Sequence, residues 1–413
     1  MRILFFSHYF PPEGNAPAAR TYAHCRRWAA AGHDVTVVTC APNHPRGVVY
    51  SGYRNRLRYV EEMDGVRVVR VFTYLAANEA FWRRAASWLS YLVSATLCGL
   101  VEQRPDVVIA TSPQPFCAWA GVLVSRCHRR PLLLEIRDLW PESVAAVGAL
   151  RSRPVLKLID LLAQGPCRAA ARVVTVGEGY RQGLAQRGLD PARIDIVMNG
   201  VDPELFHPRA ADPAVAAEFG LVGRFVVTYC GTIGLAHDLE IVLRAGAALR
   251  ARGRQDIVFL LAGDGARLDA LRAAASEARL DNVVFTGRLE RRQIPVVLAT
   301  SDVCLVHLRD SETFASVMPS KIFEGAAMGL PLILGVRGFA KRFVDDARCG
   351  LCIDPEDSEG LVTAVLKLAD DPAMCRRLGQ AGRAHVSQFD RERLAVQYLQ
   401  IIERTAGLER GHA

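Results

Sequence analysis

The feature that most constrains the fold is an alternation of short apolar runs with helical stretches, which occurs in two consecutive sets along the 413-residue chain. Unbroken runs of Val, Ile and Leu are typical of strands buried on both faces, and their alternation with helices predicts parallel βαβ units. Two sets of about six runs predict two doubly wound α/β domains. The expected strands are Ile3–Phe6, Val35–Thr39, Val66–Phe72, Val107–Thr111, Leu132–Ile136 and Val173–Val176, then Phe225–Cys230, Ile257–Ala262, Val283–Thr286, Val303–His307, Pro331–Leu334 and Leu351–Ile353.

The join between the two domains is expected near Asn199–Pro208, where Gly, Asp and two prolines interrupt the periodicity. A chain of this length also exceeds what one hydrophobic core normally supports. We therefore expect one domain over residues 1–203 and a second over 204–389. Residues 390–413 should form a helix that packs back on the first domain.

The net charge of +8 is placed unevenly. Up to Leu205 the chain has 25 Lys and Arg against 17 Asp and Glu, whereas the remainder has 26 of each. A basic half attracts anionic lipid headgroups or a phosphorylated acceptor, although arginine could simply serve solubility here. Nucleic acid is not expected as a partner, because the basic residues are dispersed without an aromatic platform.

The eleven cysteines are scattered, and most lie in apolar surroundings, which suits a reducing, cytoplasmic compartment. Cys349 and Cys352 form a C-x-x-C, but no second Cys or His pair lies nearby, so neither zinc binding nor redox chemistry is expected.

No uncharged apolar run is long enough to span a bilayer. The segment Phe81–Val101 predicts a long apolar helix with Trp82, Trp88 and two arginines near one end. It could lie on a membrane surface, or pack in the core against Val107–Thr111, or do both with different faces.

Two groups of polar residues follow strands of the first set. Gly14 and Asn15 follow Ile3–Phe6 and precede a helix expected from about Ala16. Glycine allows close backbone approach, and a helix N-terminus attracts phosphate or sugar hydroxyls. Arg137 and Asp138 follow Leu132–Ile136, where they could form a mutual salt bridge or bind phosphate and sugar hydroxyls, respectively.

In the second set, Gly231, Thr232 and Gly234 follow Phe225–Cys230 and lead into a helix at about Asp238. The spacing lacks the third glycine of a dinucleotide fingerprint, so no NAD site is expected. As at Gly14, these glycines beside a helix start allow close backbone approach and suit phosphate or sugar hydroxyls.

A further helix start is predicted at Pro319, with Ser320 as its N-cap. Lys321 then lies in the first turn, where the helix dipole disfavours a cation unless an anion binds there. Glu324 shares its helix face. The two could form an i,i+3 ion pair, or Lys321 could bind a diphosphate while Glu324 holds ribose hydroxyls.

No Asp-x-Asp occurs in the sequence, which removes a common way of presenting a metal ion to a nucleotide diphosphate. We therefore expect no metal and no cofactor, with leaving-group charge met by Lys, Arg and helix N-termini.

At these motifs the sequence resembles the retaining glycosyltransferases of family 4, which have the GT-B fold: two Rossmann-like, doubly wound parallel-sheet domains facing a central cleft. It is most similar to the bacterial branch that builds capsule, colanic-acid-like and O-antigen polysaccharides, including aminosugar (fucosamine) transferases. The resemblance runs over essentially the whole chain, and the segments that carry it are HYFPPEGNAPAAR, IRDLWPES, NGVD, YCGTIGLAHDLE, FTGRL and PSKIFEGAAMGLPLI.

The resemblance implies that Gly14 and Asn15 face the donor, and that Asp138, with Arg137 where many members carry His, lines the sugar site. It also implies contacts in the second domain: Gly231–Gly234 and Pro319–Lys321 with the phosphates, Arg288 and Leu289 with the base, and Glu324 with the ribose.

Two positions depart from the family pattern. Ser316 stands where many members have a Glu, and Leu235, Ala236 and His237 follow the glycines where many have an Arg and a Lys. Lys321, with Arg137, must then supply the charge, so the identity of the phosphate ligands is open.

The implied reaction transfers a hexose or deoxyaminosugar from a UDP-sugar or GDP-sugar to a polyprenyl-diphosphate-linked saccharide, with retained configuration, in lipopolysaccharide or exopolysaccharide biosynthesis. The enzyme would be cytoplasmic and peripheral to the membrane. A nucleotide-sugar 2-epimerase of related shape and a non-catalytic sugar-nucleotide-binding subunit remain alternatives.

Overall fold

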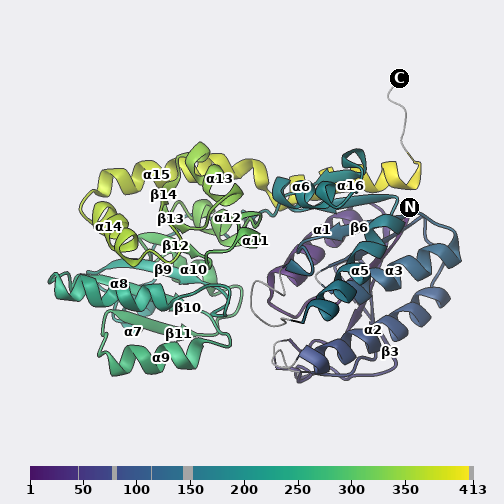
Figure 1. The fold of residues 1–413 in the computed structure, drawn as a ribbon, viewed down its shortest axis with the longest axis horizontal. Coiled ribbons are helices and arrows are strands. Elements are labelled where there is room, and N and C mark those ends of the chain that lie inside the picture. The colour runs from purple at the N-terminus through teal and green to yellow at the C-terminus, as the bar shows by residue number, and fades with distance from the viewer. Residues whose placement is uncertain (45, 77–80, 113, 143–151, 409–413) are drawn as a thin grey trace. The chain divides into compact units, whose positions relative to one another are not determined.

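The computed structural model describes residues 1–44, 46–76, 81–112, 114–142 and 152–408 (Figure 1). The chain divides into two compact units. The first comprises Met1–Asn199 together with Arg391–Ala413, and the second comprises Gly200–Asp390.

The first unit is built on an eight-stranded sheet with the strand order β3-β4-β2-β1-β5-β6-β7-β8, parallel throughout except for β3. Strands β1, β5 and β6 are adjacent, so their carboxyl ends lie side by side at one edge. The strands are β1 (Arg2–Phe6), β2 (Asp34–Cys40), β3 (Arg58–Met63), β4 (Val66–Val71), β5 (Val107–Thr111), β6 (Leu132–Ile136), β7 (Arg172–Thr175) and β8 (Ile194–Ile196).

Two of these strands, β3 and β8, carry no long apolar run and were not predicted. Most residues of β3 are exposed, and it forms an antiparallel hairpin with β4 through Asp64 and Gly65, both at positive φ. This is the two-residue Asp-Gly connection that favours hairpins, so the signal lies in the turn. Strand β8 has only three residues and ends the sheet.

Helices cover both faces of this sheet. Helix α2 packs on β2 and β4, α3 packs on β1 and β5, and α5 packs on α3 and β6. Helices α1 and α16 pack against each other on the opposite face, where Trp28 Nε1 donates to the Ala395 carbonyl at 2.9 Å. The helices are α1 (Ala16–Ala30), α2 (Phe81–Val101), α3 (Pro115–His128), α5 (Arg153–Ala169), α6 (Glu178–Gln186), η1 (Pro191–Arg193) and α16 (Arg391–Ala406).

The second unit has a six-stranded parallel sheet with the order β11-β10-β9-β12-β13-β14. All six strands match predicted runs, with ends shifted by one residue at most. They are β9 (Phe225–Cys230), β10 (Ile257–Ala262), β11 (Val283–Gly287), β12 (Val303–His307), β13 (Leu332–Gly335) and β14 (Gly350–Cys352).

Helices α8, α9 and α14 pack together with this sheet, while α12, α13 and α15 form a second group that contacts β12, β13 and β14. The helices of this unit are α7 (Pro213–Glu218), α8 (Glu240–Ala251), α9 (Leu268–Glu277), α10 (Ile294–Leu298), α11 (Glu312–Ala315), α12 (Ser320–Ala327), α13 (Phe339–Ala347), α14 (Ser358–Ala369), α15 (Pro372–Val386) and η2 (Ser387–Phe389). Within the described parts of both units, no helix has the length and apolarity needed to cross a membrane.

Candidate functional site

The loop after β1 leads into a helix at Ala16, as the sequence predicts, and the start of this helix is capped. Asn15 is the N-cap of α1, and its Oδ1 accepts a hydrogen bond from the Ala18 amide at 2.9 Å. A Cβ placed on Gly14 would meet no atom within 4 Å, so open space adjoins this backbone. The loop therefore presents an accessible backbone beside a helix N-terminus.

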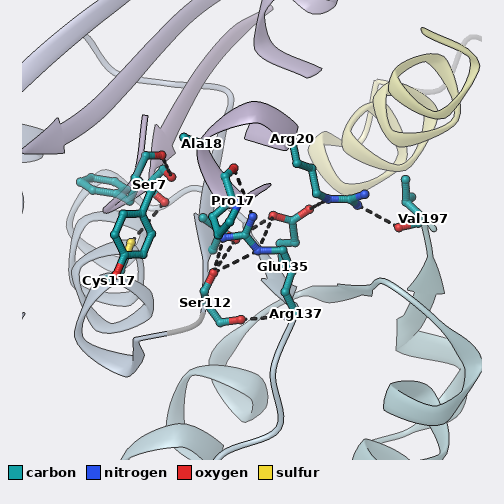
Figure 2. Close-up of polar contacts among 12 residues, drawn as sticks. Ser7, Pro17, Ala18, Arg20, Ser112, Cys117, Glu135, Arg137 and Val197 are labelled. Carbon is teal, nitrogen blue, oxygen red and sulfur yellow. Dashed lines mark hydrogen bonds and ion pairs between the residues drawn. The ribbon is translucent and has the colours of Figure 1, made fainter. Parts of the chain in front are cut away.

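Arg137, which follows β6, holds two neighbouring strand ends and the start of a helix together (Figure 2). Its Nη2 and Nε donate to the Ser112 carbonyl at 2.6 and 3.2 Å, and its Nη1 donates to the Pro17 carbonyl at 3.3 Å. Its backbone amide donates to Ser112 Oγ at 2.8 Å. The guanidinium thus links the end of β5, the end of β6 and the start of α1, and most of its donors are already engaged.

Beside the Arg137 guanidinium lies a buried charge cluster centred on Glu135, which sequence reasoning missed (Figure 2). Glu135 Oε1 pairs with Arg20 Nε at 2.9 Å, and Oε2 accepts from Thr111 Oγ1 at 2.7 Å and lies 3.8 Å from Arg137 Nε. Burial works to raise the pKa of Glu135, but Arg20 and Arg137 outweigh it and hold that pKa at about 2. The cluster is therefore ionised at neutral pH, and its contacts hold the Arg20 and Arg137 side chains in place at the carboxyl ends of the strands.

Asp138 does not form the mutual salt bridge with Arg137 that was one alternative, since the ion pair of Arg137 is with Glu135. Within the described chain, its carboxyl group makes no hydrogen bond or ion pair. It lines a largely apolar pocket whose walls include Trp140 and Leu184. Burial raises the pKa of Asp138 to about 6, against the opposing charge of Arg137. Asp138 is therefore a carboxyl group with free hydrogen-bonding capacity at the edge of the sheet.

In the second unit, Lys321 lies in the first turn of α12 as predicted. Its Nζ stands 4.8 Å from the centre of the Tyr229 ring, and it forms no ion pair or hydrogen bond with any residue the structure describes. Burial lowers the pKa of Lys321, while Glu324 is among the groups that oppose this. An ammonium without an anionic partner, at a helix start, has the character of an anion-binding group.

The glycine turn after β9 is built around this lysine. Gly231 has a φ of 139°, and a Cβ there would lie 2.7 Å from Lys321 Cε. Two glycines that the sequence analysis did not select, Gly263 and Gly265, follow β10 and support the turn. Their added Cβ atoms would lie 1.8 Å from the Gly231 carbonyl oxygen and 2.3 Å from that of Ile233. The Gly-Asp-Gly sequence at this strand end was the available signal.

Glu324 pairs with Arg291 and not with Lys321, so the i,i+3 ion pair is absent from the structure. Arg291 Nη2 lies 3.3 Å from Glu324 Oε1, and its guanidinium lies 5.3 Å from the centre of the Phe206 ring. Arg291 follows β11 closely, after Arg288 and Leu289, which were predicted to meet the base. The structure therefore brings the predicted base segment beside the predicted ribose carboxylate.

One detail of the helix start was wrong: Pro319 is the N-cap of α12 and Ser320 is its first residue, without a side-chain capping bond. The expected helix at about Asp238 begins two residues later, with α8 at Glu240.

His237 stands where many family members have a cation, but burial, followed by the charge of Lys321, lowers its pKa to about 3. It is neutral at physiological pH and adds no charge to Lys321. Within the described ranges, no three His, Cys, Asp or Glu side chains are grouped as a metal site, the C-x-x-C included.

In comparisons with known proteins, each of the two units matches a glycosyl transferase family. Residues 15–200 match the glycosyl transferase 4-like domain, and residues 217–385 match the glycosyl transferases group 1. A D-inositol 3-phosphate glycosyltransferase of Rhodococcus opacus (strain B4) is 32% identical over 321 residues, covering 68% of this chain and 70% of that protein. WcaI of Escherichia coli (strain K12), named as a colanic acid biosynthesis glycosyl transferase, is 24% identical over 379 residues, covering 88% of this chain and 91% of that protein.

Among solved structures, Anabaena Alr3699/HepE in complex with UDP-glucose superposes with a TM-score of 0.72 at 18% identity, covering 98% of this chain and all of that one. At this identity the likeness establishes the fold alone. Both units have parallel-sheet folds, the family matches cover both of them, and the Rhodococcus relative is 32% identical over 321 residues. The chain is a GT-B glycosyltransferase that belongs to the group 1 (family 4) glycosyl transferases.

Proposed function

We propose that this enzyme transfers a hexose or deoxyaminosugar from a nucleotide diphosphate sugar to a lipid-linked saccharide during cell-surface polysaccharide biosynthesis. The observation that carries the proposal is the unpaired Lys321 ammonium beside the Gly231 turn, with Glu324 one helical turn further on. The name of WcaI supports the pathway, and the UDP-glucose bound to HepE supports a UDP-sugar, with a GDP-sugar as the alternative.

In the proposed donor site, Lys321 and the backbone amides of Thr232, Gly234, Ser320 and Lys321 offer positive charge to the diphosphate, whereas the amides of Gly231 and Ile233 already donate to the carbonyls of Ala262 and Asp264. Pro319 itself has no amide hydrogen, so Ser320 and Lys321 supply the donors at the helix start. Glu324 accepts from ribose hydroxyls, and Arg288 and Leu289 meet the base. A metal ion has no assigned part in this scheme.

The proposed chemical step keeps the configuration of the sugar. The bond from the anomeric carbon to the diphosphate oxygen breaks, and the acceptor oxygen bonds to the same face. The acceptor proton passes to the departing diphosphate oxygen. Asp138 orients the sugar or acceptor hydroxyls, and Arg137 positions the loop that carries Asp138. Electrostatic stabilisation of the leaving group supplies most of the rate enhancement.

Helix α2 supports the proposed contact with a membrane surface. One face is buried, through Trp88, Tyr91 and Ala95, while the other carries exposed apolar side chains. Leu89, Val93 and Leu97 recur at a spacing of four and are 51%, 54% and 62% exposed. The excess positive charge of the chain lies in this half, which complements anionic headgroups.

The first test is donor identification by thermal shift with UDP-, GDP- and ADP-sugars. A true donor at a hundred times its Kd should stabilise the protein by about 2.7 kcal/mol. The stabilisation should be lost in Lys321→Met and kept in Lys341→Met, a matched control in which the replaced lysine is an exposed partner of Asp345.

The second test is transfer from that donor to a polyprenyl-diphosphate-linked saccharide, with the anomeric configuration of the product read by NMR. Conversion of the donor without acceptor would instead indicate an epimerase. Unchanged polysaccharide production by cells carrying Lys321→Met would contradict a catalytic role for this chain.

A further inference from the structure

We infer that Arg84, with His8 and Tyr9, forms a second anion-binding site that holds the phosphate or diphosphate group of the lipid-linked acceptor. The inference rests on the proposed function, because it specifies how the first unit would recognise such an acceptor. It assigns a site to side chains that the donor scheme does not use.

The proposed site is an aromatic cluster just beyond β1. The ring of His8 lies 5.1 Å from that of Tyr9 and 5.0 Å from that of Tyr91, both edge-on. The ring of His44 packs edge-on against Tyr9 at 5.3 Å. The carboxyl end of β1 is thus connected directly to helix α2 through Tyr91.

Arg84, Trp88 and Tyr91 lie on one face of α2, since they are spaced by four and three residues. The Arg84 guanidinium stands 4.9 Å from the centre of the Trp88 ring. This spacing places Arg84 along the helix face that packs on His8, and its charge helps to lower the pKa of His8.

Arg84 makes no hydrogen bond or ion pair with a residue that the structure describes. It is half-buried, it lies in the first turn of α2, and no acidic residue shares that turn. Both burial and the helix dipole disfavour an unpaired cation in such a position, and burial lowers the pKa of Arg84. An anion supplied by a ligand would remove both penalties.

A second unpaired group belongs to the same cluster. His8 Nδ1 has no hydrogen-bond partner, and the residue is only 8% exposed. Burial is the largest cause that lowers the pKa of His8, to about 4, so the ring is neutral and can donate one hydrogen bond. A buried polar atom without a partner is costly unless a ligand or water satisfies it.

Glu13 is close enough to Tyr9 for its charge to affect the Tyr9 hydroxyl. A carboxylate there would repel a bound anion, so its charge state bears on the proposed site. Glu13 Oε1 accepts from the amides of Asn43 and His44, both at 2.9 Å. Burial raises the pKa of Glu13 to about 7, which favours its neutral form relative to an ordinary carboxyl group. Its repulsion of an anion is accordingly reduced.

The chemical class of ligand follows from the groups and from their position. A guanidinium matches phosphate oxygens with a planar set of donors. The exposed apolar face of α2 begins beside Arg84, with Trp82 at 69% and Leu89 at 51% exposed. An anion joined to a hydrocarbon chain fits this juxtaposition, whereas a free polyol would leave the apolar face unused.

The test measures binding of farnesyl diphosphate to full-length protein by titration calorimetry. All variants carry Lys321→Ala, so that the proposed donor site does not contribute. Arg84→Gln should weaken binding on the order of tenfold or more, because it removes a charge-assisted contact. Arg83→Gln is the matched control: Arg83 is exposed on the same helix, and its loss should change the Kd less than about twofold.

Arg84→Lys, which keeps the charge but not the fork, should recover part of the affinity. In transfer assays with Lys321 intact, Arg84→Gln should raise the acceptor KM while the donor KM stays constant. Equal binding by the Lys321→Ala parent and by its Arg84→Gln derivative, or equal dependence of farnesol binding on Arg84, would overturn the inference. Equal losses of affinity in Arg83→Gln and Arg84→Gln, both for anionic vesicles and for farnesyl diphosphate, would also overturn the inference. Such a result would indicate attraction to any anionic surface.

The two proposals can fail separately. Arg84-dependent binding of farnesyl diphosphate without transfer to any lipid-linked saccharide would refute the proposed function and leave the site standing. Transfer to such an acceptor that is unaffected by Arg84→Gln would support the proposed function and refute the Arg84 site.

Discussion

The buried Glu135 cluster makes a strong prediction about stability, through the substitution Glu135→Gln. The amide keeps an oxygen that can accept from Arg20, and it nearly preserves the volume. It removes the negative charge opposite Arg20 and Arg137, whose side chains are 6% and 9% exposed. The substitution therefore isolates the electrostatic contribution of one carboxylate from cavity effects.

Two independent estimates of the unfolding free energy lost in Glu135→Gln are similar. Removing one partner of a buried ion pair costs about 3–5 kcal/mol, because it leaves an uncompensated charge. Lowering the pKa of a glutamate from 4.5 to about 2 corresponds to about 3 kcal/mol, at about 1.36 kcal/mol per pH unit. For a unit of roughly 200 residues this predicts a fall in Tm of roughly 6–12 °C.

The pH dependence has a defined sign. A depressed folded-state pKa gives stability that is fully present above pH 4.5 and is lost as the pH falls toward about 2. The difference in unfolding free energy between wild type and Glu135→Gln should therefore be constant from pH 7 to 5, and it should narrow below pH 4.5.

The assay is calorimetric or chemical unfolding at several pH values. Glu178→Gln serves as the control, because it removes a carboxylate from an exposed i,i+3 pair in the same unit, where the expected loss is under about 1 kcal/mol. The reasoning would be refuted if Glu135→Gln lowered the unfolding free energy no more than Glu178→Gln does. It would also be refuted if the loss in Glu135→Gln were the same at pH 3.5 as at pH 7.

The other predictions concern the proposed reaction. Gly263→Ala should lower affinity for the nucleotide sugar by tenfold or more, because its Cβ would lie 1.8 Å from the Gly231 carbonyl oxygen; isothermal titration measures this, and wild-type affinity would contradict it. If ionised Asp138 is required, kcat/KM should fall as the pH drops through about 6, and this acidic limb should be missing from the slower Asp138→Asn enzyme. Lys321→Met should reduce kcat by about 10²–10³, as expected for loss of a leaving-group contact, with a control by Lys341→Met. Turnover should survive EDTA, and loss that added Mg²⁺ restores would show that a metal ion takes part.

The sequence was sufficient for most of the architecture. Of the fourteen strands in the described part of the chain, twelve were predicted from apolar runs, because a strand buried on both faces has a local signature within a few residues. Strand β3 escaped this reasoning because it is an exposed edge strand, and only its Asp64-Gly65 turn marked it. The position of Lys321 in a first helical turn could also be predicted from local sequence, since Pro319 and Ser320 indicate a helix start.

What the sequence could not determine was which charged groups meet. Glu324 has Lys321 three residues away, yet it pairs with Arg291, 33 residues earlier. Arg137 is adjacent to Asp138, yet it contacts Ser112, Pro17 and Glu135. Arg20 and Glu135 are 115 residues apart. Such pairs depend on the lateral order of the strands and on which helix covers which face, and both are set by packing between distant segments. Local periodicity determined the elements and the residues at their ends, and the tertiary structure alone decided the partners of those residues.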